Sequence, residues 1–148
     1  MTRRVRTLPR LHRFALVGAG GAVGGLLRYG LVTALPERPG TFPWTTFTIN
    51  AVGSFALGLL VAGFVARRAA HPWVRPALGT GLLGGFTTFS AYAHAVDLLA
   101  TGNRAGVAVA YLVGSVLAGV VGAAVGIAVG VRLPTRATVV VPDGDGPR

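Results

Sequence analysis

The segment with the most distinctive chemistry, residues 84–90, contains paired glycines and paired threonines. It lies in the middle of an apolar stretch, residues 77–96, that contains no Asp, Glu, Lys or Arg. Such a stretch is long enough to cross a membrane as a helix, but paired glycines and β-branched threonines weaken a helix. Irregular backbone at membrane depth persists only where protein or an aqueous cavity satisfies its N–H and C=O groups. We therefore predict an interrupted helix whose free backbone groups form an ion or substrate site.

Two polar side chains in other apolar segments are further candidates, because a polar group in a membrane span costs free energy unless it is paired. Asn50 shares one helical face with Gly53 and Ser54, and its amide suits either an interhelical hydrogen bond or an anion. Arg28 ends the first apolar segment. It either extends to the membrane interface, or lines a pore entrance or holds the neighbouring helices.

Aromatic and hydroxyl side chains complete the candidate set. Phe89 and Tyr92 are three residues apart on the resumed helix, where positive ring edges can face an anion without the strong attraction of an ammonium group. Tyr111 and Ser115 are four residues apart and present two hydroxyl groups on one stripe. Core packing is the alternative for the aromatic pair, and Ser115 can instead bond to its own helix.

Composition indicates which elements position these residues. Of the 148 residues, 52% are hydrophobic and 12% are charged, and the mean hydropathy is +0.64. Since about 20 apolar residues cross the hydrocarbon core, we predict an all-α membrane protein with four transmembrane helices. The expected spans are residues 14–35, 47–66, 77–100 and 107–131, with the third helix broken mid-membrane. The 23 glycines supply small surfaces for close helix packing.

The distribution of arginine predicts the orientation of the chain. All 14 basic residues are arginine: five precede the first span, three lie between the second and third, and three follow the fourth. If four helices cross, these 11 share one side of the membrane, against three on the other. Both termini are therefore expected to be cytoplasmic, in a multi-pass protein of the cell membrane. The expected domains are a basic N-terminal tail (1–13), a transmembrane domain (14–132) and a disordered C-terminal tail (133–148).

Several functions are disfavoured by the same residues. The net charge of +10 would suggest nucleic acid in a soluble protein, but these arginines flank apolar spans, so no nucleic acid partner is expected. A nucleophile with a base, or a metal cluster, is not evident, which argues against an enzyme. No carboxylate lies at the centre of a span. This weakens, but leaves open, a small four-helix multidrug or metabolite transporter, and a structural or assembly membrane protein is the third alternative.

Four motifs follow one another along the chain, one in each predicted span. In chain order they are Gly20-Gly21-x-x-Gly24-x-x-x-Arg28-Tyr29, Thr46-Phe47-x-x-Asn50-x-x-Gly53-Ser54-Phe55-x-x-Gly58, Gly84-Gly85-Phe86-Thr87-Thr88-Phe89-Ser90 and Tyr111-x-x-x-Ser115-x-x-x-Gly119. Together they resemble the Fluc/CrcB fluoride channel family. Because the four motifs cover the whole predicted membrane domain in the right order, this resemblance is far more specific than any single motif.

The resemblance implies a passive, fluoride-selective channel, built as an antiparallel dimer with two pores in the membrane lipid, that exports cytoplasmic fluoride and relieves its toxicity. It also implies a structural sodium ion at the dimer interface, bound by the backbone carbonyl oxygens of Gly84 and Thr87. The residues implied for the fluoride path are Asn50, Phe89, Tyr92, Ser90, Thr88, Tyr111, Ser115 and Arg28.

Three positions depart from the usual family pattern. Tyr92 stands where the family usually has Phe, Ala91 stands where it usually has Thr, and Gly119 replaces what is sometimes a hydroxyl residue. The second aromatic contact is therefore expected to present a phenol, and the polar track beside it is expected to be thinner.

The arginine distribution also bears on the partner subunit. An antiparallel homodimer requires one sequence to insert in both orientations, which a bias of 11 arginines to three disfavours. We therefore expect this chain to pair with a homologous, oppositely oriented subunit. Dual topology in a homodimer is the alternative.

Overall fold

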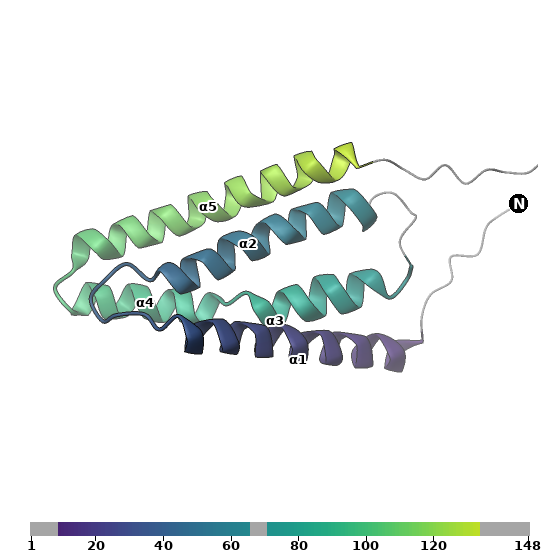
Figure 1. Ribbon diagram of the computed structural model, residues 1–148, viewed down its shortest axis with the longest axis horizontal. Coiled ribbons are helices and arrows are strands. Elements are labelled where there is room, and N and C mark those ends of the chain that lie inside the picture. The colour runs from purple at the N-terminus through teal and green to yellow at the C-terminus, as the bar shows by residue number, and fades with distance from the viewer. Residues whose placement is uncertain (1–8, 66–70, 134–148) are drawn as a thin grey trace, which may run out of the picture.

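The computed structural model describes residues 9–65 and 71–133, and this part of the chain folds into helices joined by short turns (Figure 1). The helical segments are α1 (Arg10–Ala34), α2 (Trp44–Leu60), η1 (Val61–Val65), η2 (Arg75–Leu83), α3 (Gly84–Phe86), α4 (Phe89–Thr101) and α5 (Ala105–Arg132). The π-helical segments η1 and η2 extend α2 and α3 without a break. Residues 1–8 and 134–148 of the two predicted tails, and residue 66 of the second predicted span, lie outside the described residues.

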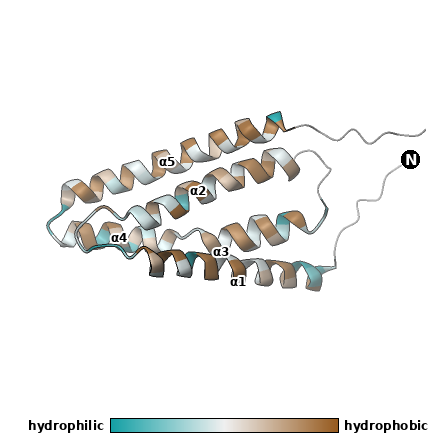
Figure 2. Ribbon diagram, viewed as in Figure 1, coloured by the Kyte–Doolittle hydropathy of each residue, from teal (hydrophilic) through white to brown (hydrophobic). Residues whose placement is uncertain are grey.

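Three described helices are long and apolar enough to cross a membrane: Arg10–Ala34, Trp44–Phe64 and Ala105–Arg132. Brown and white predominate along these helices, and teal marks the start of α1 and the end of α5 as well as single positions within α1 and α2 (Figure 2). The first two begin earlier than the predicted residues 14 and 47, because Pro9 and Pro43 stand directly before them. Proline suits the start of a helix, where its missing N–H would have no helical partner. The third predicted span is not one continuous helix in the structure.

The helices form two parallel pairs. In Figure 1, α1 lies alongside η2 and α3, and α2 lies alongside α5. Within each pair the two members run in the same direction, so that the first residues of α1 and η2 lie at one end of the molecule. This arrangement places the segment η2–α3–α4 between α1 on one side and α2 and α5 on the other.

Both pairs pack through glycine, as the sequence predicts. A methyl group on Gly24 of α1 would overlap the carbonyl oxygen of Leu82, and a methyl group on Gly126 of α5 would overlap the carbonyl oxygen of Phe55. Glycine at these positions therefore allows the backbones of neighbouring helices to touch. Such close approach maximises dispersion contacts, which hold helices together where lipid removes the hydrophobic driving force.

The backbone between α3 and α4 is extended at two residues. Thr87 has ψ 158°, and Thr88 has φ −148° and ψ 120°. Helix α4 then begins at Phe89, and the Thr88 side chain accepts a hydrogen bond from the N–H of Ala91 at 3.1 Å. Threonine is a favourable N-cap because its hydroxyl satisfies one of the free N–H groups at a helix start. The residue types of this segment therefore both stop one helix and start the next.

Candidate functional site

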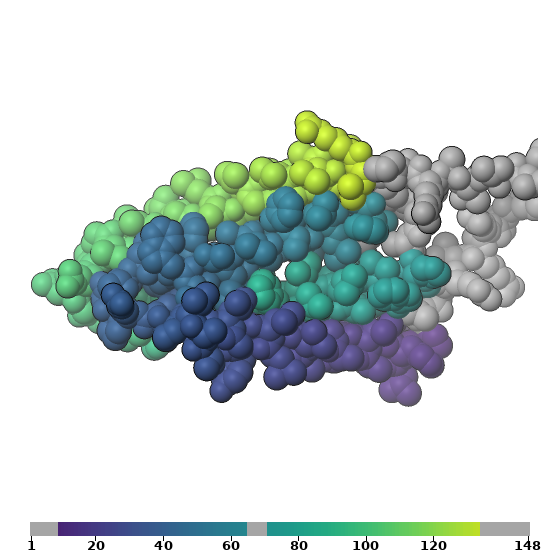
Figure 3. Space-filling view, viewed as in Figure 1, coloured from purple at the N-terminus to yellow at the C-terminus, as the bar shows by residue number. Residues whose placement is uncertain are grey.

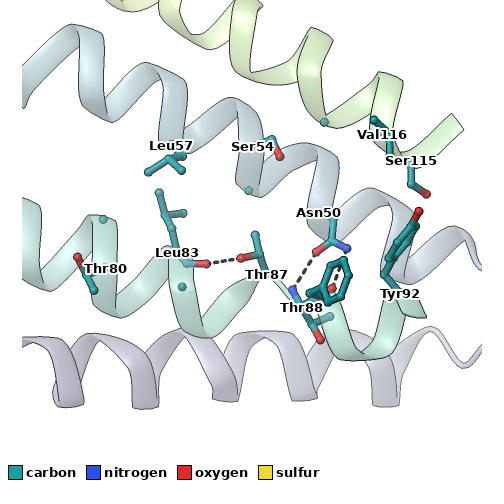
Figure 4. Close-up of a pocket in the computed structure, with 15 residues that line it drawn as sticks. Asn50, Ser54, Leu57, Thr80, Leu83, Thr87, Thr88, Tyr92, Ser115 and Val116 are labelled. Carbon is teal, nitrogen blue, oxygen red and sulfur yellow. Dashed lines mark hydrogen bonds between the residues drawn. The ribbon is translucent and has the colours of Figure 1, made fainter. Parts of the chain in front are cut away.

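A pocket of about 580 Å³ opens where the interrupted segment faces α2 and α5. The molecule is visibly hollowed between α2 and the η2–α3 segment (Figure 3), and Figure 4 shows the lining side chains. The residues that line the pocket are small, apolar or neutral and polar: Asn50, Gly53, Ser54, Leu57, Gly79, Thr80, Leu83, Gly84, Thr87, Thr88, Phe89, Tyr92, Ser115, Val116 and Gly119. None of these residues is an Asp, Glu, Lys, Arg or His, so the lining carries no formal charge.

Asn50 of α2 is bound to the extended backbone. Its side-chain Nδ2 donates to the carbonyl oxygen of Thr88 at 3.0 Å, and the Thr88 N–H donates to Asn50 Oδ1 at 2.9 Å (Figure 4). One amide thus satisfies both backbone groups of a residue that the helix interruption leaves without helical partners. A carboxamide has two N–H donors, so one N–H of Asn50 remains for a ligand.

The backbone oxygens on the N-terminal side of the interruption have unequal surroundings. The Leu83 carbonyl oxygen accepts both from the N–H of Thr87 at 3.0 Å and from its hydroxyl at 2.8 Å. The next carbonyl along the helix, that of Gly84, would accept from the N–H of Thr88 in a continuous α-helix. Since that N–H donates to Asn50 instead, the Gly84 oxygen lacks its usual helical donor.

Two aromatic rings stand beside Asn50 at the start of α4. The ring centroids of Phe89 and Tyr92 are 5.7 Å apart, and Phe89 is 80% exposed. The Tyr92 hydroxyl donates to the carbonyl oxygen of Leu112 on α5 at 3.3 Å. Because that bond uses the only O–H proton of Tyr92, this residue offers a ligand its ring edge rather than a phenol donor.

The two hydroxyl residues of α5, Tyr111 and Ser115, have different surroundings. Tyr111 is fully buried at 0% exposure in a cluster with Leu99 and Ala108, and its ring centroid lies 5.4 Å from that of Tyr92. Ser115 lines the pocket, whereas Tyr111 lies behind it. Among the described residues, neither hydroxyl has a hydrogen-bond partner. An unpaired buried hydroxyl costs about 1–3 kcal/mol, so a ligand in the pocket could bind the Ser115 hydroxyl at little further cost. Tyr111 is fully buried and does not line the pocket, so its hydroxyl does not face such a ligand.

Arg28 and Ser90 are predicted site residues that do not line this pocket. Arg28 Nε donates to the carbonyl oxygen of Gly85 at 3.2 Å, which ties α1 to α3. This contact corresponds to the alternative in which Arg28 holds the neighbouring helices. The Ser90 hydroxyl lies 3.2 Å from that of Thr88 on the exposed start of α4.

Sequence reasoning missed part of the pocket wall. Thr80 and Leu83 of η2 line the pocket together with Gly84 and Thr87. Their spacing of three and four residues is that of a single helical face, so the periodicity leading into the interruption could have identified them. Leu57 and Val116 also line the pocket, but apolar residues in apolar helices give no comparable signal.

The residues that line the pocket lie in a part of the chain that is similar to known proteins. The profile of the family described as CrcB-like protein, Camphor Resistance (CrcB), matches residues 15–127, which include every residue lining the pocket. A fluoride-specific ion channel FluC 2 of Nocardia farcinica is 43% identical over 102 residues, covering 69% of this chain and 73% of that protein. A fluoride-specific ion channel FluC of Novosphingobium aromaticivorans is 45% identical over 108 residues, covering 71% and 85%. Another, from Rhizobium meliloti, is 43% identical over 108 residues, covering 72% and 86%.

Proposed function

The chain belongs to the CrcB family, and from this membership we propose that it is a fluoride-selective channel through which cytoplasmic fluoride leaves the cell passively. The relatives are named as ion channels, and the chain is accordingly a channel protein rather than an enzyme. One observation carries the proposal for this chain: the Asn50 amide, bound to Thr88, stands beside the Phe89 and Tyr92 rings in a pocket without charged residues.

The neutral lining suits fluoride for a physical reason. Fluoride is small and strongly hydrated, so a conducting site must replace its water with donors that are adequate but that release the ion again. The remaining N–H of Asn50, the ring edges of Phe89 and Tyr92, and the Ser115 hydroxyl are neutral groups of this kind. A guanidinium group at the same place would hold the anion more tightly, and Arg28 is engaged elsewhere.

We further propose that the interrupted segment crosses the membrane, with its extended residues at membrane depth. The support comes from α1, which is long and apolar enough to span. Gly24 lies near the middle of α1 and packs on Leu82, five residues before Thr87. Five helical residues extend about 8 Å, so the interruption falls within the same apolar layer. The pairing of Asn50 with Thr88 is then the device that satisfies backbone groups where water is scarce.

The exposure of this pocket supports a second subunit that covers it. Phe89 exposes 80% of its surface, and an anion path cannot be open to lipid tails. We propose that an antiparallel partner closes the pocket, and that each subunit contributes one such pocket, which gives two pores per dimer. The arginine bias of 11 to three supports a chain inserted with both termini in the cytoplasm, paired with a homologous subunit of opposite orientation.

We also propose a structural sodium ion, held at the dimer interface by the main-chain oxygens of Gly84 and Thr87. The Gly84 oxygen fits this role, because the N–H that would normally bond it donates to Asn50. Two such oxygens from each of two subunits make four hard ligands, a suitable set for a small hard cation. In the described part of the chain, no group of three or more His, Cys, Asp and Glu side chains offers a metal site. Bound sodium would neutralise the partial negative charge of these oxygens and join the subunits.

Fluoride efflux from liposomes containing the purified full-length protein tests the proposed function. We expect fluoride to leave down its gradient without a proton gradient, and chloride to be retained in parallel liposomes. A fluoride flux that requires a proton gradient would indicate a coupled transporter rather than a passive channel, whereas the multidrug or metabolite transporter predicts no fluoride flux. No fluoride flux from correctly folded protein, alone or with a homologous subunit, would contradict the channel.

A further inference from the structure

A second pocket, of about 470 Å³, lies at the end of the molecule where α1 and η2 both begin. One wall is a single face of α1, formed by Arg10, Arg13, Phe14 and Val17, whose spacing of three, four and seven residues is helical. The other wall is the start of η2 and includes Arg75. Two helices that are distant in sequence thus bring three guanidinium groups to one pocket.

Among the described residues, no acidic side chain lies beside these three guanidinium groups. The acidic residues of the described part of the chain are Glu37, in the loop between α1 and α2, and Asp97, in α4. This loop and α4 lie at the opposite end of the molecule (Figure 1). The 25-residue helix α1 alone separates Arg10 from the Glu37 loop by roughly 37 Å. Within residues 9–65 and 71–133, no hydrogen bond or ion pair engages these three side chains. The pocket therefore concentrates positive charge, and a bound anion would reduce the repulsion between the three guanidinium groups.

The pocket is also amphipathic along the axis of α1. Arg10 and Arg13 lie in the first turn of α1, a helix that is apolar enough to span, and hydrophilic residues mark this end of the molecule in Figure 2. Phe14 and Val17 follow about one turn deeper, and Phe14 exposes 71% of its surface. A phosphate at the arginines and a hydrocarbon chain along Phe14 would match both parts of the pocket, whereas inorganic phosphate would use only the first.

We propose that this pocket binds an anionic phospholipid, with the lipid phosphate held by Arg10, Arg13 and Arg75. Arginine presents a planar fork of N–H donors that matches phosphate oxygens in pairs. Basic pockets between helices on the cytoplasmic side of a membrane are suited to acidic lipid headgroups. The site is separate from the proposed fluoride path, although Thr80 of η2 lines both pockets.

Thermal unfolding of the purified full-length protein in a neutral detergent provides the test. The protein is titrated with phosphatidylglycerol, phosphatidylcholine or inorganic phosphate, and the affinity is obtained from the saturable rise in the unfolding midpoint. We expect phosphatidylglycerol to bind at least about 10-fold more tightly than phosphatidylcholine, because it carries a net negative charge, whereas the choline ammonium of phosphatidylcholine offsets the phosphate charge and is repelled by the arginines. Inorganic phosphate at the same concentration should give no comparable rise.

The double variant Arg13→Gln/Arg75→Gln should lose this preference, with phosphatidylglycerol falling to the affinity of phosphatidylcholine. Arg132→Gln is the matched control, because Arg132 ends α5 at the same end of the molecule but does not line the pocket. Equal affinities for the two lipids in the native protein would overturn the proposal, as would an undiminished preference in the double variant or an equal loss in the control. A response to inorganic phosphate as large as that to phosphatidylglycerol would assign the pocket to a free anion. If the double variant does not fold, the comparison of the three ligands on the native protein still decides.

Discussion

The pocket proposed for fluoride and the pocket proposed for a phospholipid bind anions by opposite means. The larger one, of about 580 Å³, is lined by an amide, hydroxyl groups and aromatic rings, and none of its lining residues is charged. The smaller one, of about 470 Å³, has three arginines. Neutral donors suit an ion that must leave again, whereas guanidinium groups suit an anion that stays bound.

The helix η2 contributes to both pockets, so the difference between them comes from position along this helix. Arg75 stands at its first residue, whereas Leu83 is its last and leads into the interruption. Charge is tolerated at the membrane boundary and costly deeper in the apolar layer. Helix η2 can therefore carry a charged group at its first residue, near the membrane boundary, and neutral pocket residues at its other end, deeper in the apolar layer.

The largest effect is expected when a charge is placed in the neutral pocket. We expect Asn50→Asp to reduce fluoride efflux from liposomes by at least about 100-fold, because a carboxylate repels the anion and cannot donate to the Thr88 carbonyl oxygen. Asn103→Asp is the matched control, since Asn103 is the only other asparagine and lies in the turn before α5. If folded Asn50→Asp protein conducts fluoride at the native rate, Asn50 does not contact the ion.

A smaller effect is expected when ring chemistry is removed from the neutral pocket. Phe89→Ile replaces the positive ring edge by an aliphatic group of similar hydrophobicity, and we expect fluoride efflux to fall about 10-fold, the loss of roughly one favourable aromatic contact. Phe64→Ile makes the same change at a half-exposed ring of η1 that does not line the pocket. Equal rates for both variants and the native protein would reduce Phe89 to a packing residue.

The glycine contacts that position η2 for both pockets can be tested without touching either lining. A methyl group on Gly24 would overlap the carbonyl oxygen of Leu82, so Gly24→Ala should destabilise the fold by about 1–3 kcal/mol. A methyl group on the adjacent Gly25 meets nothing within 4 Å, and Gly25→Ala should be neutral or slightly stabilising. The unfolding midpoints of the two variants measure the difference, and identical midpoints would mean that α1 adjusts freely.

The smallest effect on fluoride efflux is expected when charge is removed from the smaller pocket. Arg13→Gln/Arg75→Gln removes two of three guanidinium groups from the smaller pocket, outside the proposed fluoride path. In liposomes of phosphatidylcholine alone, we expect its fluoride efflux to stay within about 2-fold of the native rate, because surface charges act on neighbours mainly through screened, weak fields. A large loss of flux in these liposomes would make the arginines an entrance for fluoride and join the two pockets functionally.

Much of this arrangement follows from the sequence. Glycine-rich apolar segments predict the closely packed helices, and the run from Gly84 to Ser90 predicts that the third segment is not one helix. Helical spacing correctly places Asn50 and Ser54 on one face, since both line the larger pocket. These features are local, because they depend on propensity and periodicity within a single segment.

The remaining features depend on contacts between segments, which periodicity does not specify. The partner of Asn50 is the backbone of a residue 38 positions away, and that of Arg28 is a carbonyl 57 positions away. Burial of Tyr111 behind Ser115 depends on how α4 packs on α5. The charged pocket arises only because the first turns of α1 and η2 meet. In the sequence, these arginines are equally well explained as the positive charges that flank membrane spans on the cytoplasmic side.

Nitrogen–fluorine dipolar coupling in solid-state NMR tests the central claim most directly, on protein labelled with ¹⁵N at the asparagine side chains and held in liposomes with sodium fluoride. The chain has two asparagines, so Asn103 serves as the internal control. We predict a fluoride ion within about 3 Å of the Asn50 side-chain nitrogen, the length of a hydrogen bond, and no coupling at Asn103. Absence of coupling at Asn50 in a sample that conducts fluoride would contradict the account.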